Sequence, residues 1–92
     1  MSYRTEFPDF VLDVTIPTGF IDVSWHNDVC PSFEKDDGTF QTRVWIDYKN
    51  AVSRESSSNP RFSISMYENG DFVNDMMVTD DWNEIVAMLQ TK

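Results

Sequence analysis

The stretch RFSISMYENGDFVNDMMV, residues 61–78, decides the fold because it combines two strand-like runs with a turn. Phe62, Ile64 and Met66 alternate with polar residues, which is the period of a strand with one buried face. Asn69-Gly70 between the runs allows two connections: a two-residue type I′ turn, or a three-residue loop with a left-handed glycine and a bulge. Either connection predicts a β-hairpin.

The register of the hairpin separates the two connections. The two-residue turn would place Asp75 opposite Ile64 and so bury a carboxylate. The three-residue loop, Glu68-Asn69-Gly70, keeps the apolar side chains together on one face. We therefore expect the three-residue loop, with these pairs: Met66 with Phe72, and Phe62 with Met76.

The rest of the chain predicts further strands and one helix. Phe10–Ile16 and Ile21–Trp25 alternate and are expected to pair, and Thr39–Tyr48 is expected to be the longest strand. Trp82 begins an apolar stripe at helical spacing, next to acidic residues that suit the positive end of a helix dipole. The sequence therefore predicts an α+β fold: an antiparallel meander sheet of four to five strands with one C-terminal helix packed on one face.

Three polar segments are expected to lie outside this framework. Residues 1–9 should form a loosely held lead-in, residues 26–38 a long loop, and residues 49–60 a mobile serine-rich connection. Phe33 is the expected inward anchor of the long loop, with Val29 and Cys30 as further candidates. These anchors would tie the loop to the core.

Composition and charge limit the size of the fold and the kind of partner. The 92 residues make one domain, residues 1–92, and 40% of them are hydrophobic, which is enough for a single core. Sixteen acidic residues against seven basic ones give a formal net charge of −9. This balance opposes direct binding to nucleic acid and favours a protein partner with a basic surface. A solvated acidic surface without a partner would explain the same charge.

Cysteine content and hydropathy bear on the cellular location. Cys30 is the single cysteine, so an internal disulfide is excluded and a reducing, cytoplasmic setting is expected. Charged residues interrupt any signal-peptide core in the first twenty residues, and no apolar run approaches the length of a membrane span. We therefore expect no membrane association.

One candidate for chemistry is the segment His26-Asn27-Asp28-Val29-Cys30. A cysteine nucleophile needs a base such as His26 nearby, but no glycine-rich turn that could form an oxyanion hole accompanies the segment. The acidic residues near His26 also lack the alternation and closing glutamate of a calcium-binding loop. We expect no enzyme activity, no metal and no cofactor. A small thiol-dependent enzyme using Cys30 and His26 is the alternative.

The sheet face away from the helix is the candidate contact surface. Large aromatic residues, methionine and arginine are enriched at the centres of protein interfaces. The side chains expected to point outward on this face are Trp45, Tyr67, Val73 and Met77, beside the charged residues Arg43, Asp47, Arg61 and Asp75. Either this surface contacts a partner or a second copy of the chain, or the N-terminal strands and loops cover it.

Acidic residues at the turns add further candidate contacts. Carboxylates spaced over a surface can imitate the phosphates of a duplex and occupy a basic groove on another protein. The candidates are Glu34, Asp36, Asp37, Asp71, Asp80 and Asp81. A solvated surface rich in helix and turn caps would explain the same residues.

Four short motifs carry a resemblance: WHNDVCPSF (residues 25–33), RVWIDY (43–48), RFSI (61–64) and DDW (80–82). With these motifs the chain resembles small acidic proteins of unassigned function that phages, plasmids and other mobile elements carry. Proteins of this size and charge in such elements include anti-CRISPR proteins and DNA mimics. The resemblance implies a non-enzymatic inhibitor of a bacterial defence or nucleic-acid-binding protein, and it assigns no role to any single residue. A homodimeric domain without an inhibitory role is a further alternative.

Overall fold

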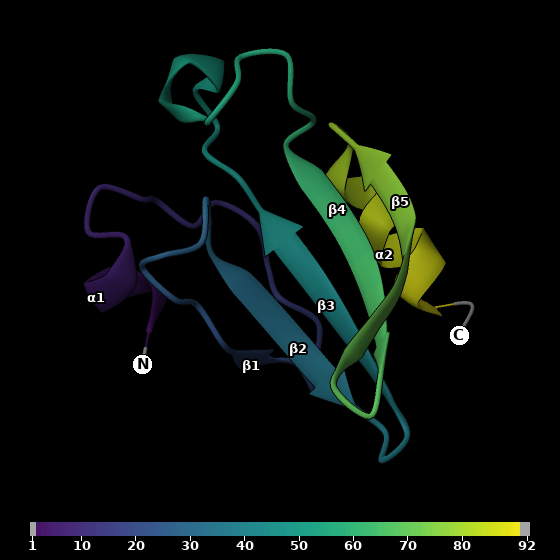
Figure 1. The fold of residues 1–92 in the computed structure, drawn as a ribbon. Coiled ribbons are helices and arrows are strands. Elements are labelled where there is room, and N and C mark those ends of the chain that lie inside the picture. The colour runs from purple at the N-terminus through teal and green to yellow at the C-terminus, as the bar shows by residue number, and fades with distance from the viewer. Residues whose placement is uncertain (1, 91–92) are drawn as a thin grey trace.

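The computed structural model describes residues 2–90 and shows an α+β fold, an open antiparallel sheet with a helix on one face (Figure 1). The five strands lie side by side in sequence order, so the expected meander is confirmed. Helix α2 (Trp82–Gln90) packs behind the last two strands. The strands are β1 (Ile21–Asp22), β2 (Ser32–Asp36), β3 (Phe40–Ile46), β4 (Phe62–Glu68) and β5 (Asp71–Thr79).

The core lies between the inner face of the sheet and the two segments that cover it, α2 and residues 7–16. Alternate residues of β3 and β4 point to the same side, and the pairing of Val44 with Ile64 places both side chains in the interior. Ile85 of α2 is fully buried against them. The helix begins where the sequence predicts, because Asp81 Oδ1 accepts a hydrogen bond from the Asn83 amide at 2.9 Å.

The hairpin of β4 and β5 turns through two residues, so the expected three-residue loop is wrong. Asn69 and Gly70 have φ values of 51° and 88°, as a type I′ turn requires, and Glu68 pairs with Asp71. Strand β5 has nine residues and β4 has seven, because bulges insert two residues, Val73 and Met76, into β5.

The bulges remove the objection to the two-residue turn. They shift the register so that Asp75 lies opposite Ser65, and Met77, not Asp75, lies opposite Ile64. The expected pairs of Met66 with Phe72 and of Phe62 with Met76 are therefore wrong. Met77 packs against the core, which corrects the expectation that it points outward.

The N-terminal segment differs most from the expectation. Residues 10–16 form no strand: they cross the inner face of the sheet, where Leu12, Val14 and Ile16 pack against the core. Their alternation is real, but it reflects packing on a face and not pairing at an edge. The expected strand Ile21–Trp25 is reduced to β1, and its partner is β2, which lies inside the segment expected to be a loop.

Residues 2–7 are anchored, which corrects the expected loose lead-in for this part of residues 1–9. Helix α1 (Tyr3–Glu6) starts after Ser2, whose hydroxyl caps it, and the Tyr3 amide donates to Asp22 Oδ2 at 2.8 Å. Phe7 is buried in the core. Helix α1 is thus tied to β1.

The connections on either side of β3 are held in different ways. Phe33 and Cys30 are buried as expected, whereas Val29 is 52% exposed and is not an anchor. Residues 49–60 contain the short 3₁₀ helix η1 (Ala51–Ser53). The Arg54 guanidinium holds this connection by donating to the backbone oxygens of Tyr48, Lys49 and Asn59.

Candidate functional site

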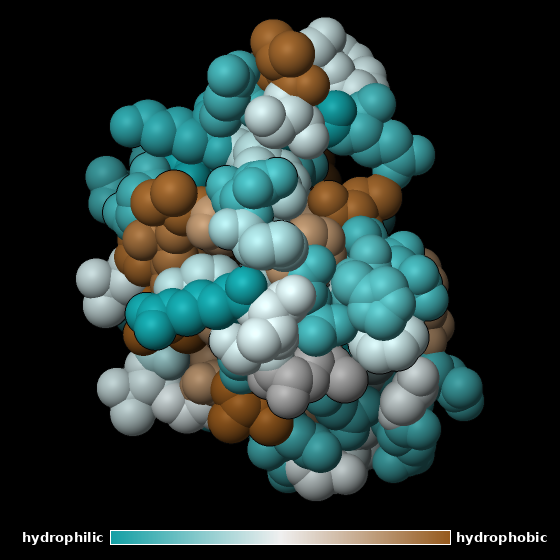
Figure 2. Space-filling model, turned by 90° about the vertical axis from the view of Figure 1, so that its left-hand side faces the viewer, coloured by the Kyte–Doolittle hydropathy of each residue, from teal (hydrophilic) through white to brown (hydrophobic). Residues whose placement is uncertain are grey.

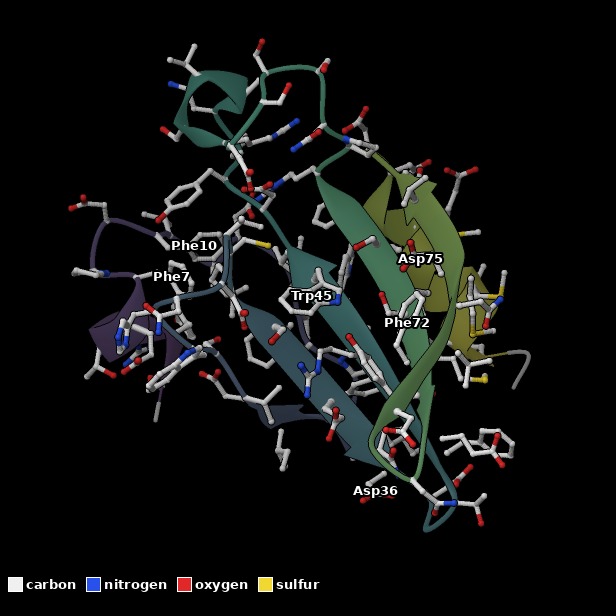
Figure 3. All side chains as sticks on the ribbon, viewed as in Figure 1. Phe7, Phe10, Asp36, Trp45, Phe72 and Asp75 are labelled. Atoms are coloured by element: carbon white, nitrogen blue, oxygen red, sulfur yellow. The ribbon has the colours of Figure 1, made fainter. Side chains whose placement is uncertain are left out.

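The outer face of the sheet, the one turned away from α2, carries the aromatic residues expected there. Trp45 pairs with Ser63 and Tyr67 with Gln41, one position out of step with the buried pair Val44 and Ile64, so both aromatic side chains project outward. Figure 3 shows Trp45 on this face, with Phe72 and Asp75 across β4 from it. Both Trp45 and Tyr67 are half-buried.

A hollow of about 420 Å³ lies on this face and is the candidate site. Its volume falls in the range of about 300–1,000 Å³ that is usual for ligand sites. Phe72 is 59% exposed and packs edge-on against Tyr67, with ring centres 5.7 Å apart. The lining residues are Val29, Cys30, Trp45, Asp47, Asn59, Pro60, Arg61, Phe62, Ser63, Ser65, Tyr67, Phe72, Asp75 and Val78.

Arg43 fixes the two aromatic rings beside the hollow. Its Nε and Nη2 atoms donate to Glu34 Oε1 at 3.1 and 2.8 Å. The centre of its guanidinium lies 5.5 Å from the ring centre of Trp45 and 5.1 Å from that of Tyr67. These distances are within the reach of about 6 Å for a cation–π contact, so the positive charge is shared between a carboxylate and two rings.

Two carboxylates border the hollow. Asp47 is buried, and burial raises its pKa, although its Oδ1 accepts a hydrogen bond from the Tyr48 amide at 2.8 Å. Asp75 is exposed and accepts a hydrogen bond from the Ser65 hydroxyl at 2.8 Å. Asp75 has no salt bridge to a lysine or arginine of residues 2–90. Its negative charge is therefore open to an external cation.

Arg61 also lines the hollow, but its charge is compensated within the chain. Its terminal nitrogens form an ion pair with the Asp13 carboxylate, and its Nε donates to the Asp47 carbonyl oxygen at 3.1 Å. Asp13 therefore has a lowered pKa, chiefly because of its hydrogen bonds to Arg61. The rim of the hollow thus has a negative balance.

The other acidic candidates are spread over turns and caps. Asp36 accepts from the Gly38 amide and from Gln41 Nε2, and these bonds lower its pKa. Asp37 accepts from the Phe40 amide, and Asp80 accepts from the Arg61 amide. Asp81 caps α2, and Asp71 lies exposed at the tip of the hairpin.

A second depression adjoins the hollow at Tyr67. It has a volume of about 440 Å³, and its lining residues are mostly polar. Those residues are Glu34, Asp36, Gln41, Arg43, Tyr67, Asn69 and Gly70. The structure thus brings four acidic candidates onto the outer face: Asp47 and Asp75 in the hollow, and Glu34 and Asp36 in the second depression.

Phe72 is the site residue that sequence reasoning missed. The expected register pairs it with Met66 and turns it inward, whereas the two-residue turn places it opposite Tyr67 on the outer face. The signal was present in Asn69-Gly70, the residue pair that favours a type I′ turn. Val73, expected on the same face, is exposed but occupies a bulge and does not line the hollow.

The side of the molecule that carries α1 and β1 is mainly hydrophilic (Figure 2). Its hydrophobic residues form separate patches there. The outer face differs, because it gathers aromatic rings around one hollow. An interface with an apolar centre and a polar rim therefore fits the outer face better than it fits the side with α1 and β1.

The geometry of Cys30 and His26 does not favour thiol chemistry. Cys30 is buried, and its pKa is raised chiefly by burial and further by Asp47 and Asp28. A raised pKa keeps the thiol protonated at neutral pH, whereas a nucleophile needs the thiolate. His26 Nδ1 lies 2.9 Å from Glu6 Oε1, and its ring packs on Trp25. Glu6 thus holds the imidazole at the surface.

Metal chemistry and similarity to known proteins give no further lead. Among residues 2–90, no group of three His, Cys, Asp or Glu side chains is placed to hold a metal ion. No helix within the same range is long and apolar enough to cross a membrane. Comparison with protein-family models, curated proteins and solved structures finds no match for this chain.

Proposed function

We propose that this chain is a non-enzymatic binding protein whose outer sheet face contacts a basic surface of a protein partner. The observation that carries this proposal is the hollow, where the rings of Trp45, Tyr67 and Phe72 lie beside the carboxylate of Asp75. This carboxylate has no salt bridge to a basic side chain of residues 2–90. Large exposed apolar groups gathered in one place are typical of interaction sites.

The aromatic residues of the face and the net charge of the whole chain have different roles in this proposal. Trp45, Tyr67 and Phe72 supply apolar area, and residues of this type are common among those that dominate binding energy. The net charge of −9 supplies long-range attraction, which raises the association rate with a basic partner. The burial of Cys30, which also raises its pKa, disfavours the alternative of a thiol-dependent enzyme.

The most specific form of the proposal is an inhibitor of a bacterial defence or nucleic-acid-binding protein. Such a partner has a basic groove for phosphates, and an acidic protein that covers this groove would compete with nucleic acid. Support for this form comes from the acidic charge, the small size and the sequence resemblance. Competition between this chain and nucleic acid for a basic protein would test it.

An NMR titration with defined peptides tests the general proposal. The probes are a short peptide rich in arginine and lysine, and a matched peptide in which acidic residues replace the basic ones. We expect only the basic peptide to bind, with affinity falling between about 50 and 300 mM salt as screening increases. The shifted amide signals should come from the residues of β3, β4 and β5 whose side chains lie on the outer face. Absence of binding, or shifts centred on α2, would refute the proposal.

A further inference from the structure

We infer that the hollow receives one arginine side chain of the partner, stacked on Trp45 and paired with Asp75. This inference rests on the proposed function and names the group that the outer face recognises. Trp45 of β3 and Asp75 of β5 lie on opposite sides of β4, and both line the hollow. A guanidinium between them would meet an aromatic ring and a carboxylate together (Figure 3).

Arg43 provides a precedent within the same molecule. Its guanidinium lies 5.5 Å from the Trp45 ring centre and 5.1 Å from the Tyr67 ring centre, and it is bound to Glu34. The hollow contains the same set of groups: Trp45 and Tyr67 line it, and Asp75 corresponds to Glu34. A combination that holds an arginine of the chain itself can hold a second one from outside.

The chemistry of the hollow favours arginine over lysine. Guanidinium is planar, stacks on aromatic rings and can form two hydrogen bonds to one carboxylate, whereas ammonium is a compact and strongly hydrated charge. The wall also includes Val29, Pro60 and Val78, which can pack against the methylene groups of an arginine stem. The site therefore matches both parts of the side chain.

The charge balance at the rim supports a cationic occupant. Asp47 and Asp75 line the hollow, and Arg61, the one cation among residues 2–90 that lines it, is paired with Asp13. Asp75 is held in place by the Ser65 hydroxyl, which limits the ordering that binding would require. An anion would meet Asp75 directly and be repelled.

The test uses a peptide whose only charged group is a single arginine, and a control peptide with citrulline at that position. Citrulline has nearly the same shape without the charge. Binding is followed by the NMR signal of the Trp45 indole N–H. We expect the arginine peptide to bind at least about tenfold more tightly than the citrulline peptide, and several-fold more tightly than a lysine peptide.

Matched variants locate the interaction. Asp75→Asn removes the charge but keeps an oxygen for Ser65, and it should weaken arginine binding about tenfold. Trp45→Leu should abolish the preference for arginine over lysine, provided that circular dichroism shows a folded protein. Because this variant lacks the Trp45 indole, its binding is followed by the backbone amide signals of β3, β4 and β5. Glu84→Gln changes the charge equally on α2, across the sheet from the hollow, and should leave affinity unchanged.

The outcomes separate this inference from the proposed function. Equal affinity for the arginine and citrulline peptides, or an Asp75→Asn variant that binds like Glu84→Gln, would overturn the inference. The proposed function would then still stand if the basic peptide shifts signals on the outer face. Failure of every basic peptide to bind would overturn both.

Discussion

The Arg61→Ala variant is expected to lower the free energy of unfolding by about 2–3 kcal/mol, because Arg61 ties the N-terminal segment to β4. Its side chain is 10% exposed and forms an ion pair with Asp13 and a hydrogen bond to the Asp47 carbonyl oxygen. Its guanidinium also lies 4.8 Å from the ring centre of Phe62. Alanine would remove all three contacts.

The magnitude follows from the exposure of each contact. The Asp13 side chain is 32% exposed, so the ion pair is placed near the upper end of surface pairs, at about 1 kcal/mol. The bond from a charged donor to the Asp47 carbonyl oxygen adds about 1 kcal/mol, and the contact with Phe62 adds roughly 0.5 kcal/mol. Asp13→Ala removes the ion pair alone and should cost about 1 kcal/mol.

A double-mutant cycle measures the ion pair itself. Urea unfolding of the wild type, Arg61→Ala, Asp13→Ala and the double variant, followed by tryptophan fluorescence, should give a coupling energy of about 1 kcal/mol at pH 7. Single-variant effects that add to within about 0.3 kcal/mol would refute the reasoning, because independent sites behave in that way.

The cycle has a defined pH dependence. Because Arg61 lowers the pKa of Asp13, the stability from this pair is complete above the ordinary aspartate pKa of about 4. It is lost as the pH falls through the lowered pKa of the folded state. The coupling should therefore be equal at pH 7 and pH 5 and should shrink at lower pH. A coupling that shrinks between pH 7 and pH 5 would contradict the assignment.

Three further predictions concern the turn and the buried groups. Gly70→Ala should cost about 1 kcal/mol, because φ at this position is +88° while the added methyl meets open space, and urea unfolding measures this cost. Asp47→Asn should raise the free energy of unfolding at pH 7 and not below pH 4: a buried acid with a raised pKa loses stability as the pH rises, and asparagine still accepts from the Tyr48 amide. Cys30 should react slowly with iodoacetamide in the folded protein at pH 7 and rapidly in urea; equal rates would contradict its burial.

The elements that the sequence predicts well are those whose pattern is local. The alternation in residues 61–67 and 40–46 and the helical spacing after Trp82 each match their element to within a few residues. These segments pack against one another, so their apolar period directly reflects the core. The meander and the helix on one face follow from them.

The remaining elements depend on interactions that a local pattern does not show. Strand β2 has one fully apolar residue, Phe33, so it shows no period, and its place is set by pairing with β3. Residues 10–16 alternate because they pack on the sheet, and this period alone also fits a strand. The bulges at Val73 and Met76 leave Asp75 opposite Ser65 and Met77 opposite Ile64, and the local alternation of residues 71–79 does not show them.

The candidate site could be predicted only in part for the same reason. Trp45 and Tyr67 reach the outer face through the simple alternation of β3 and β4. Phe72 joins them because of the two-residue turn, and the hollow is completed by Val29, Cys30 and Pro60 from the connections. The pairing of Arg61 with Asp13, which leaves the rim negative, joins residues 48 positions apart.

The most direct test of the outer face as a binding surface is a search for intermolecular nuclear Overhauser effects between the protein and the single-arginine peptide. We expect contacts from the δ-methylene protons of the peptide arginine to the ring protons of Trp45 and to Phe72. Contacts of these methylene protons with α2 or with the turn at Asp37 instead, and none with Trp45, would contradict the account.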